Sequence, residues 1–172
     1  MAVRAGDELV NPVTGQRLRF VRTAADTNGE VLEVESSYQA GGPRPPQHYH
    51  PAQQERYEVI DGDISVLLNG RIVRLRAGDQ LVIPVGAKHA VWSEGGGRIR
   101  WLITPALRTE AFFEKVYRLA ADGKVNDQGV PDLLRSAAIA REFAAEFRPA
   151  SPPWPVLRVV TTLLAPLGRL RP

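Results

Sequence analysis

The sequence predicts a mainly β domain, a barrel or sandwich of short strands, followed by C-terminal α-helices. Three observations lead to this fold class. Short apolar runs alternate with Gly-containing turns from about residue 30 to residue 105. Asn69-Gly70 favours a two-residue hairpin, because both central positions of a type I′ turn need a positive φ. After Pro105 the apolar residues recur at helical rather than strand spacing.

The expected strands follow one another closely, and we therefore assign residues 1–107 to the β domain. A turn signal at 11–15 and an alternating run at 17–22 predict an N-terminal strand or hairpin. Asp61-Gly62-Asp63 is expected to separate strands at 56–61 and 64–68. The remaining strands are expected at 32–38, 72–75, 80–83, 88–93 and 98–103.

Residues 108–172 are expected to form a helical extension that packs on the barrel or on a partner subunit. A first helix is predicted from the N-cap Thr109 to a stop at Gly123. Its apolar face comprises Phe112, Phe113, Val116, Tyr117 and Ala120. A second helix is predicted at 131–147, with a buried stripe of Leu133, Leu134, Ala137, Ala138, Ala144 and Ala145.

A proline-rich linker at 149–155 leads into an apolar and basic stretch at 156–170. Two interpretations of this last stretch stay open. It is either a helix that packs on the barrel or a partner, or an amphipathic helix that touches an anionic membrane. Its apolar run at 159–167 is too short to span a bilayer.

The composition excludes several classes of function. The chain has no cysteine, which removes disulfides, thiolate metal sites and cysteine nucleophiles. The net charge is only +3 and basic residues alternate with acidic ones, so no nucleic-acid-binding face is expected. The N-terminus carries the acidic residues Asp7 and Glu8 and lacks the apolar core of a secretory signal. We therefore predict a cytoplasmic protein.

The three histidines, His48, His50 and His89, carry all the imidazole chemistry that the chain offers. His48 and His50 stand two residues apart, which places both side chains on one face of a strand. His89 comes from a different expected strand. Three imidazoles that converge are a ligand set for a metal ion.

Glu55 stands five residues after His50, so in an uninterrupted strand its side chain would point to the opposite face. It joins the histidines only if the strand is broken between the two residues. Pro51 can break the strand, and Glu55, Tyr57 and Val59 then share the interior face with the histidines. Three imidazoles and one carboxylate suit one divalent transition metal, and ligand softness does not separate Fe, Mn, Ni, Cu and Zn.

At these residues the sequence resembles the cupin superfamily. Its first motif is matched by Gly42, His48, His50, Glu55 and Gly62 at every fixed spacing. Its second motif is matched by the residues Gly78, Pro84, Gly86 and His89. Ser93 departs from the family's usual Asn, at a position that does not hold the metal. The last 65 or so residues lie outside the resemblance.

The resemblance implies a cupin double-stranded β-helix, a jelly-roll barrel with the metal in its cavity. It implies that His48, His50, Glu55 and His89 hold the metal and leave open positions for water, O₂ or a chelating substrate. It also implies a homodimer. Because cupins include dioxygenases, decarboxylases, isomerases and binding proteins, the fold alone does not fix the function.

Two functions are compatible with this sequence. The first is a dioxygenase-like oxidoreductase acting on a small molecule, with Glu55 as general base and Tyr57 as a further catalytic residue. Tyr38 and Trp101 are its candidate substrate-binding residues, although aromatic side chains at these three positions more often serve as packing. The second is a non-catalytic metal- or ligand-binding cupin, a sensor or accessory module, whose C-terminal helices serve as an interface or lid.

Overall fold

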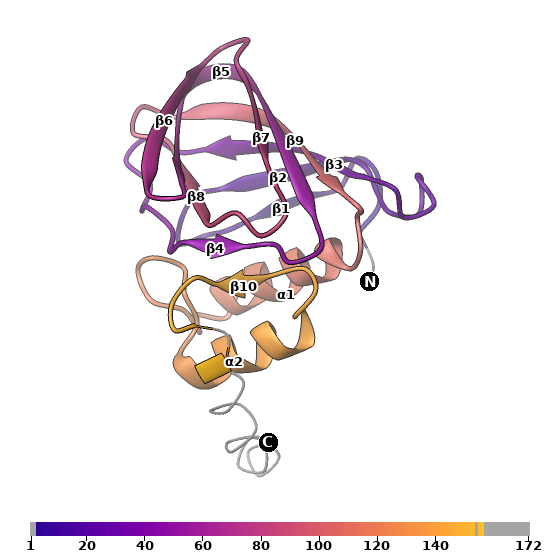
Figure 1. Ribbon diagram of the computed structural model, residues 1–172, viewed down its shortest axis with the longest axis vertical. Helices are drawn as coiled ribbons and strands as arrows, with labels where there is room; N and C mark the ends of the chain where they lie inside the picture. The colour runs from indigo at the N-terminus through magenta and orange to yellow at the C-terminus, as the bar shows by residue number, and fades with distance from the viewer. Residues whose placement is uncertain (1–2, 154, 157–172) are drawn as a thin grey trace.

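The computed structural model describes residues 3–153 and 155–156 of the chain. Antiparallel strands dominate it and confirm the predicted mainly β fold (Figure 1). The strands are β1 (Glu8–Val10), β2 (Arg17–Arg22), β3 (Leu32–Tyr38), β4 (His48–Tyr49), β5 (Gln54–Leu68), β6 (Arg71–Arg76), β7 (Gln80–Ile83), β8 (His89–Trp92), β9 (Gly97–Thr104) and β10 (Arg148–Pro149). The helices are α1 (Thr109–Ala121) and α2 (Leu133–Glu142).

The strands follow the order β1-β2-β3-β9-β5-β8-β4-β10, and β6 and β7 each pair with β5. They curl into a jelly-roll barrel whose interior is apolar. Both helices lie at the end of the barrel where β4 crosses (Figure 1). Residues from nearly every strand and from α1 meet in one core cluster, which includes Phe20, Val34, Ile64, Ile99, Ile103 and Phe113.

β5 differs from the prediction, because Asp61-Gly62-Asp63 does not interrupt it. The strand runs for 15 residues. Its first half pairs with β7 and β9, and its second half pairs with β6 and β8. A register shift between Val59 and Asp61 and a φ of +73° at Gly62 let the strand bend at this corner. The glycine therefore turns the barrel instead of ending a strand.

The outer face of β2, β3 and β9 carries paired charges. Glu33 contacts both Arg22 and Arg100 at 2.6 Å, and Arg19 pairs with Glu35 at 3.4 Å. The alternation of basic and acidic residues in the sequence thus becomes a set of cross-strand ion pairs.

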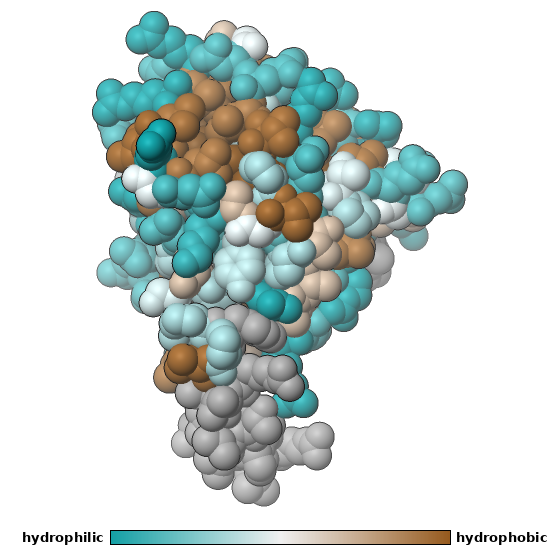
Figure 2. Space-filling model, in the orientation of Figure 1, coloured by the Kyte–Doolittle hydropathy of each residue, from teal (hydrophilic) through white to brown (hydrophobic). Residues whose placement is uncertain are grey.

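An apolar patch lies over β5, β6 and β7 (Figure 2). Exposed apolar side chains on these strands and in the turn after β7 are Ile60, Ile72, Val82 and Val85, of which Ile72 is 56% exposed. A cluster of exposed apolar side chains on a soluble domain commonly marks an interaction surface.

Helix α1 matches its prediction apart from its first residue. Phe113, Tyr117 and Ala120 are buried, and Gly123 follows the helix with a φ of +68°. Thr109 is the first helical residue rather than the N-cap, and its Oγ1 accepts a hydrogen bond from Gln53 Nε2 at 2.8 Å. The hydroxyl therefore joins α1 to the start of β5.

Helix α2 is shorter than predicted, and of the predicted buried stripe only Ala137 is fully buried. The helix ends at Glu142 instead of 147, and Leu133 and Leu134 are 61% and 50% exposed. The side chains that are actually buried are Ala137, Ile139, Ala140 and Phe143. The helical spacing of the alanines was misleading because the chain leaves the helix after Glu142 and turns toward the barrel.

The predicted last helix, 156–170, lies almost wholly outside the described residues. In the described part of the chain, no helix has the length and hydropathy required to cross a membrane.

Candidate metal centre

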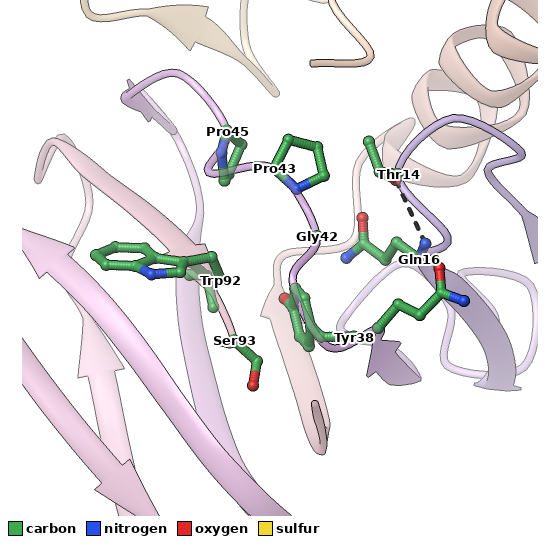
Figure 3. A pocket seen from close by; sticks show the side chains of 10 residues that line it. Thr14, Gln16, Tyr38, Gly42, Pro43, Pro45, Trp92 and Ser93 are labelled. Carbon is green, nitrogen blue, oxygen red and sulfur yellow. Dashed lines mark hydrogen bonds between the residues drawn. The ribbon is translucent and has the colours of Figure 1, made fainter. Parts of the chain in front are cut away.

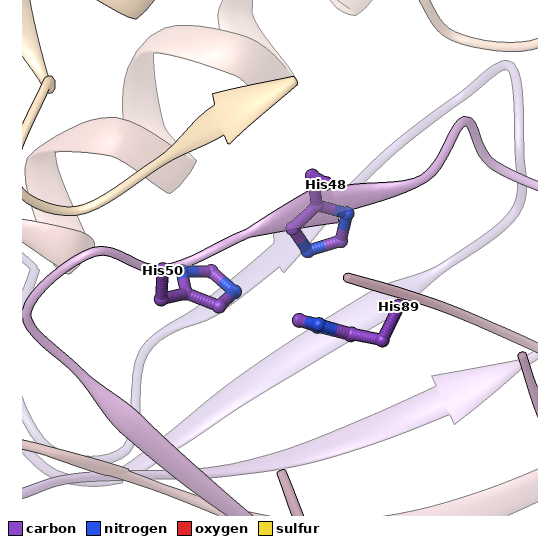
Figure 4. A group of neighbouring side chains, drawn as sticks. All are labelled: His48, His50 and His89. Carbon is purple, nitrogen blue, oxygen red and sulfur yellow. The ribbon is translucent and has the colours of Figure 1, made fainter. Parts of the chain in front are cut away.

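The three histidines lie together at the end of the barrel nearest the helices (Figure 4). β4 pairs with β8 so that His48 stands opposite His89, and His50 follows β4 directly. One ring nitrogen from each of the three lies within 4.8 Å of the other two. The structure thus brings these side chains together as the strand spacing predicts.

Glu55 lies among these rings, as the predicted break in the strand requires. The chain bends at Pro51 and Ala52, after which Glu55, Tyr57 and Val59 are all buried. Glu55 Oε1 is 3.0 Å from His50 Nε2, and Glu55 Oε2 is 2.9 Å from His89 Nε2.

These short contacts are ion pairs only while the histidine is protonated. His50 Nε2, His89 Nε2 and Glu55 Oε1 are buried and have no hydrogen-bond partner among the described residues. Buried polar atoms without a partner are rare and call for an explanation. Nitrogen and oxygen lone pairs that point at a shared position, rather than at one another, are the arrangement that a cation needs.

The other nitrogen of each ring faces a backbone carbonyl. His89 Nδ1 lies 3.0 Å from Ala87 O, and His48 Nδ1 lies 3.4 Å from Pro46 O. His50 Nδ1 lies 2.5 Å from Glu146 O. A carbonyl only accepts, so each Nδ1 carries a proton, and Nε2 is the nitrogen left to bind a metal. Histidines that bind metals through Nε2 are held in this way.

The charges at the site also suit a cation. Burial by itself would raise the pKa of Glu55, but the charge of His50 and contacts from His50 and His89 hold it well below its usual value. Burial and the neighbouring His89 and His50 keep the pKa of His48 well below its usual value. Burial would lower the pKa of His50, but the Glu55 charge, the Glu55 contact and the Glu146 carbonyl raise it. The centre therefore holds a carboxylate beside a histidine that binds a proton readily, and a divalent cation would take the place of that proton.

Tyr57 contacts Glu55 directly. Its hydroxyl donates a hydrogen bond to Glu55 Oε2 at 2.7 Å. Burial and the Glu55 charge raise the pKa of Tyr57 well above its usual value, so the phenol stays protonated. Its ring meets Trp101 edge-on at 5.8 Å, and Trp101 meets Phe113 at 5.4 Å. Trp101 Nε1 is buried and lacks a hydrogen-bond partner among the described residues.

Tyr38 lies elsewhere, at a cavity of about 50 Å³ between the barrel and the loop from Gly42 to Pro45 (Figure 3). Val91, two residues after His89 on β8, also lines this cavity. The two predicted substrate-binding residues are thus in different places, since Trp101 is not in the lining. The complete lining is Thr14, Gln16, Tyr38, Gln39, Gly42, Pro43, Pro45, Val91, Trp92 and Ser93.

The sequence reasoning missed two residues that contact the histidines, Glu146 and Phe147. Glu146 supplies the carbonyl that faces His50, and the Phe147 ring stacks on His48 at 5.0 Å. Both fall in the stretch that was predicted to continue α2. No spacing in the sequence connects residue 146 with residue 50, so only the structure could reveal this contact.

Comparison with known proteins agrees with the fold. The sequence profile of the cupin domain matches residues 34–105. An oxidoreductase of Arthrobotrys oligospora is 29% identical over 156 residues, which cover 84% of this chain and 58% of that protein. The quercetin 2,3-dioxygenase of Bacillus subtilis is 31% identical over 86 residues, 49% of this chain and 24% of that protein. The chain spans about half the length of the curated relatives it matches.

Among solved structures, a predicted oxalate decarboxylase from Thermotoga maritima aligns with a TM-score of 0.51 and 19% identity. The match covers 61% of this chain and 99% of that one. At this identity the likeness concerns the fold alone.

Proposed function

Because the chain is a member of the cupin superfamily, we propose that it is a metal-dependent, dioxygenase-like oxidoreductase that acts on a small, oxygen-bearing, chelating substrate. One observation carries the proposal. The buried Nε2 atoms of His50 and His89 lie within about 3 Å of the Glu55 oxygens without bonding to them. Relatives named as oxidoreductases support the reaction class.

The proposed ligands are His48, His50, Glu55 and His89, which together hold one divalent transition metal, Fe, Mn, Ni, Cu or Zn. Such a metal, when bound, polarises a chelating substrate and makes its protons more acidic. All three imidazoles are then used as ligands, and no fourth histidine exists in the chain to act as a base.

Proton transfer therefore falls to Glu55, supported by Tyr57. Glu55 is the buried carboxylate nearest the centre, and the Tyr57 hydroxyl holds one of its oxygens at 2.7 Å. Because the Tyr57 hydroxyl donates to Glu55 Oε2, Oε1 is the oxygen that remains to accept a proton from the substrate. Tyr57 is proposed to orient that carboxylate throughout.

Tyr38 and Trp101 are proposed to contact the substrate from two sides. Tyr38 lines the cavity beside Val91, which shares a strand face with His89. The charge of Glu55 adds to the burial that raises the pKa of Tyr38, which places the phenol within electrostatic reach of the centre. Trp101 offers a buried indole N–H that has no partner within the described chain.

The cavity at Tyr38 has room for only a few water molecules, and neither the histidines nor Glu55 line it. This favours a second candidate, a non-catalytic cupin that binds a metal or a small ligand. In that case the same residues hold the ion, and no oxidation follows.

The first experiment measures how much metal the purified protein contains. Mass spectrometry of the purified protein is expected to find about one equivalent of a transition metal, which His50→Ala abolishes. Lys88→Ala, an exposed neighbour of His89, is the matched control and should keep the metal. A wild-type chain that takes up no Fe, Mn, Ni, Cu or Zn would contradict the proposal.

Oxygen consumption then separates the two candidates. Compounds with adjacent oxygens, such as ortho-diphenols and hydroxyketones, are expected to be oxidised by the wild type and not by His50→Ala. Retained turnover in His50→Ala would place the chemistry elsewhere. A protein that binds one metal and consumes no oxygen with any of these compounds would favour the binding module.

A cytoplasmic homodimer remains part of the proposal. The exposed apolar patch that includes Ile72, Val82 and Val85 is the surface that supports self-association. Size-exclusion chromatography with light scattering is expected to give the mass of two chains. A mass of one chain at micromolar concentration would contradict the proposed homodimer.

A further inference from the structure

Residues 143–150, here called the C-terminal segment, lie outside residues 34–105, which match the cupin domain. They nevertheless reach the metal centre. β10 pairs with β4 so that Pro149 stands opposite His48, and the Ala150 N–H donates to Gln47 O at 2.9 Å. Figure 1 shows β10 beneath β4, between the barrel and the helices. The segment thus adds a strand beside the one that carries the first histidine.

The first contact with a histidine is a hydrogen bond to His50. Its Nδ1 donates to the backbone oxygen of Glu146 at 2.5 Å, and His50 is only 7% exposed. This bond fixes which nitrogen carries the proton and leaves Nε2 facing Glu55. Such partners of metal-binding histidines orient the ring and raise its basicity.

The side chain of Glu146 holds that carbonyl in place. Its Oε1 accepts hydrogen bonds from the backbone N–H of Arg108 at 3.2 Å and from Arg108 Nε at 3.1 Å. The Glu146 side chain is only 4% exposed. The Arg108 guanidinium also lies over the Phe143 ring, 5.1 Å from its centre. Arg108, the residue just before α1, therefore holds the C-terminal segment in place.

The second contact is an aromatic stack on His48. The Phe147 ring lies 5.0 Å from the His48 ring at an angle of 30°. The same ring stacks on Phe112 of α1 at 4.9 Å and 25°. Stacking between rings favours one orientation of the imidazole and removes apolar surface from water. Phe147 thus restrains His48 as the Glu146 carbonyl restrains His50.

We infer that Glu146 and Phe147 are positioning residues of the metal centre, so that the helical extension completes a site whose ligands all come from the barrel. The inference rests on the proposed function, since it concerns how the ligands are held. It assigns the extension after the barrel a role in the centre itself, because two residues that follow α2 set the orientation of two of the three histidines.

The test measures Co²⁺ binding by the full-length protein after removal of its metal. Glu146→Ala removes the hydrogen bonds from Arg108 to the Glu146 side chain, and Phe147→Ala removes the stack on His48. Each is expected to raise the dissociation constant about tenfold, within the range of about 10–100-fold that partners of metal ligands contribute. The visible d–d bands of bound Co²⁺ are expected to shift, because they depend on ligand orientation.

Matched variants separate positioning from folding. Glu142→Ala breaks an exposed ion pair with Lys115 four residues before Glu146 and is expected to bind Co²⁺ like the wild type. Glu146→Gln keeps an oxygen to accept from Arg108, and Phe147→Leu keeps an apolar side chain with little change in volume. Glu146→Gln should recover most of the affinity, and Phe147→Leu should recover less because it restores no stack.

The outcomes are distinct. Wild-type affinity and an unchanged Co²⁺ spectrum in both Glu146→Ala and Phe147→Ala would overturn the inference and leave the proposed function standing. The same holds if Glu142→Ala weakens binding as much as they do. A wild-type protein that binds no metal would instead contradict the proposed function, and the inference with it.

Discussion

Glu55 Oε2 lies 2.9 Å from His89 Nε2 in a part of the barrel where neither side chain is exposed, and Nε2 has no hydrogen-bond partner among the residues that the structure describes. In a water-excluded interior this approach leaves a polar atom unsatisfied, which costs about 1–3 kcal/mol. A cation bound by both atoms would remove this cost. The pair is therefore better explained as two ligands of one ion than as a buried ion pair.

Glu55→Gln tests this interpretation with almost no change in shape. The amide lacks the negative charge and presents a donor to the ion, so metal affinity should fall by at least about tenfold. Glu58→Gln, on the same strand, removes a half-buried carboxylate that lies 4.0 Å from Arg100. Titration of the metal-free protein with Co²⁺ or Zn²⁺ measures both, and equal affinities in the two variants would be inconsistent with Glu55 as a ligand.

Tyr57→Phe tests the hydrogen bond that the phenol donates to Glu55. Hydrogen bonds to buried charged groups contribute about 1.5–3 kcal/mol, so the free energy of unfolding of the metal-free protein should drop by that amount. Urea unfolding provides the measurement. Tyr49→Phe, on β4, is the control and should change the free energy by less than about 0.5 kcal/mol. A Tyr57→Phe protein as stable as the control would show that the hydrogen bond does not stabilise the fold.

Most of the barrel and the meeting of its histidines could be predicted, because both depend on local spacing. Alternation placed His48 beside His50, and the break at Pro51 brought Glu55 to the same interior. The strand at 32–38 and the hairpin at Asn69-Gly70 also formed as expected. These features follow from strand period and turn chemistry, which short windows of sequence contain.

Contacts that depend on distant parts of the chain could not be predicted. The alanine-rich stretch after residue 131 reads as one helix up to 147, yet tertiary contacts end it at Glu142. Glu146 then binds Arg108, and Phe147 reaches His48. Helix propensity is a weak preference, and the hydrogen bonds of Glu146 with Arg108 together with the aromatic stack of Phe147 outweigh it. Likewise, Gly62 reads as a turn although it bends a continuous strand.

Gly62→Ala tests that bend. An added Cβ would lie 2.3 Å from Gly96 O and 2.6 Å from Gly97 Cα, and the residue has a φ of +73°. Strain and collision together should lower the free energy of unfolding by more than about 2 kcal/mol. Gly78→Ala is the control, because its φ is +89° with no atom within 4 Å of the added Cβ. Thermal or urea unfolding should find the control affected less, by about 1–2 kcal/mol, and equal losses would mean that the close approach of β9 is unimportant.

Glu33 predicts a pH dependence of stability on the outer face of the barrel. Burial would raise the pKa of Glu33, but hydrogen bonds and charges from Arg100 and Arg22 outweigh it and lower the pKa below its usual 4.5. A carboxyl whose pKa is lower in the folded state stabilises the fold above the unfolded pKa. That stability is lost as the pH falls through the folded value.

Glu33→Gln should therefore reduce the free energy of unfolding by about 1–2 kcal/mol at pH 7, a moderate value because both guanidinium groups are half exposed. The difference from the wild type should shrink as the pH is lowered below 4.5. Glu35→Gln, which loses one ion pair at 3.4 Å, should cost less than about 0.5 kcal/mol. Urea unfolding between pH 7 and pH 3 measures all three proteins. A Glu33→Gln deficit that stays constant over this range would mean that the carboxylate's charge does not stabilise the sheet.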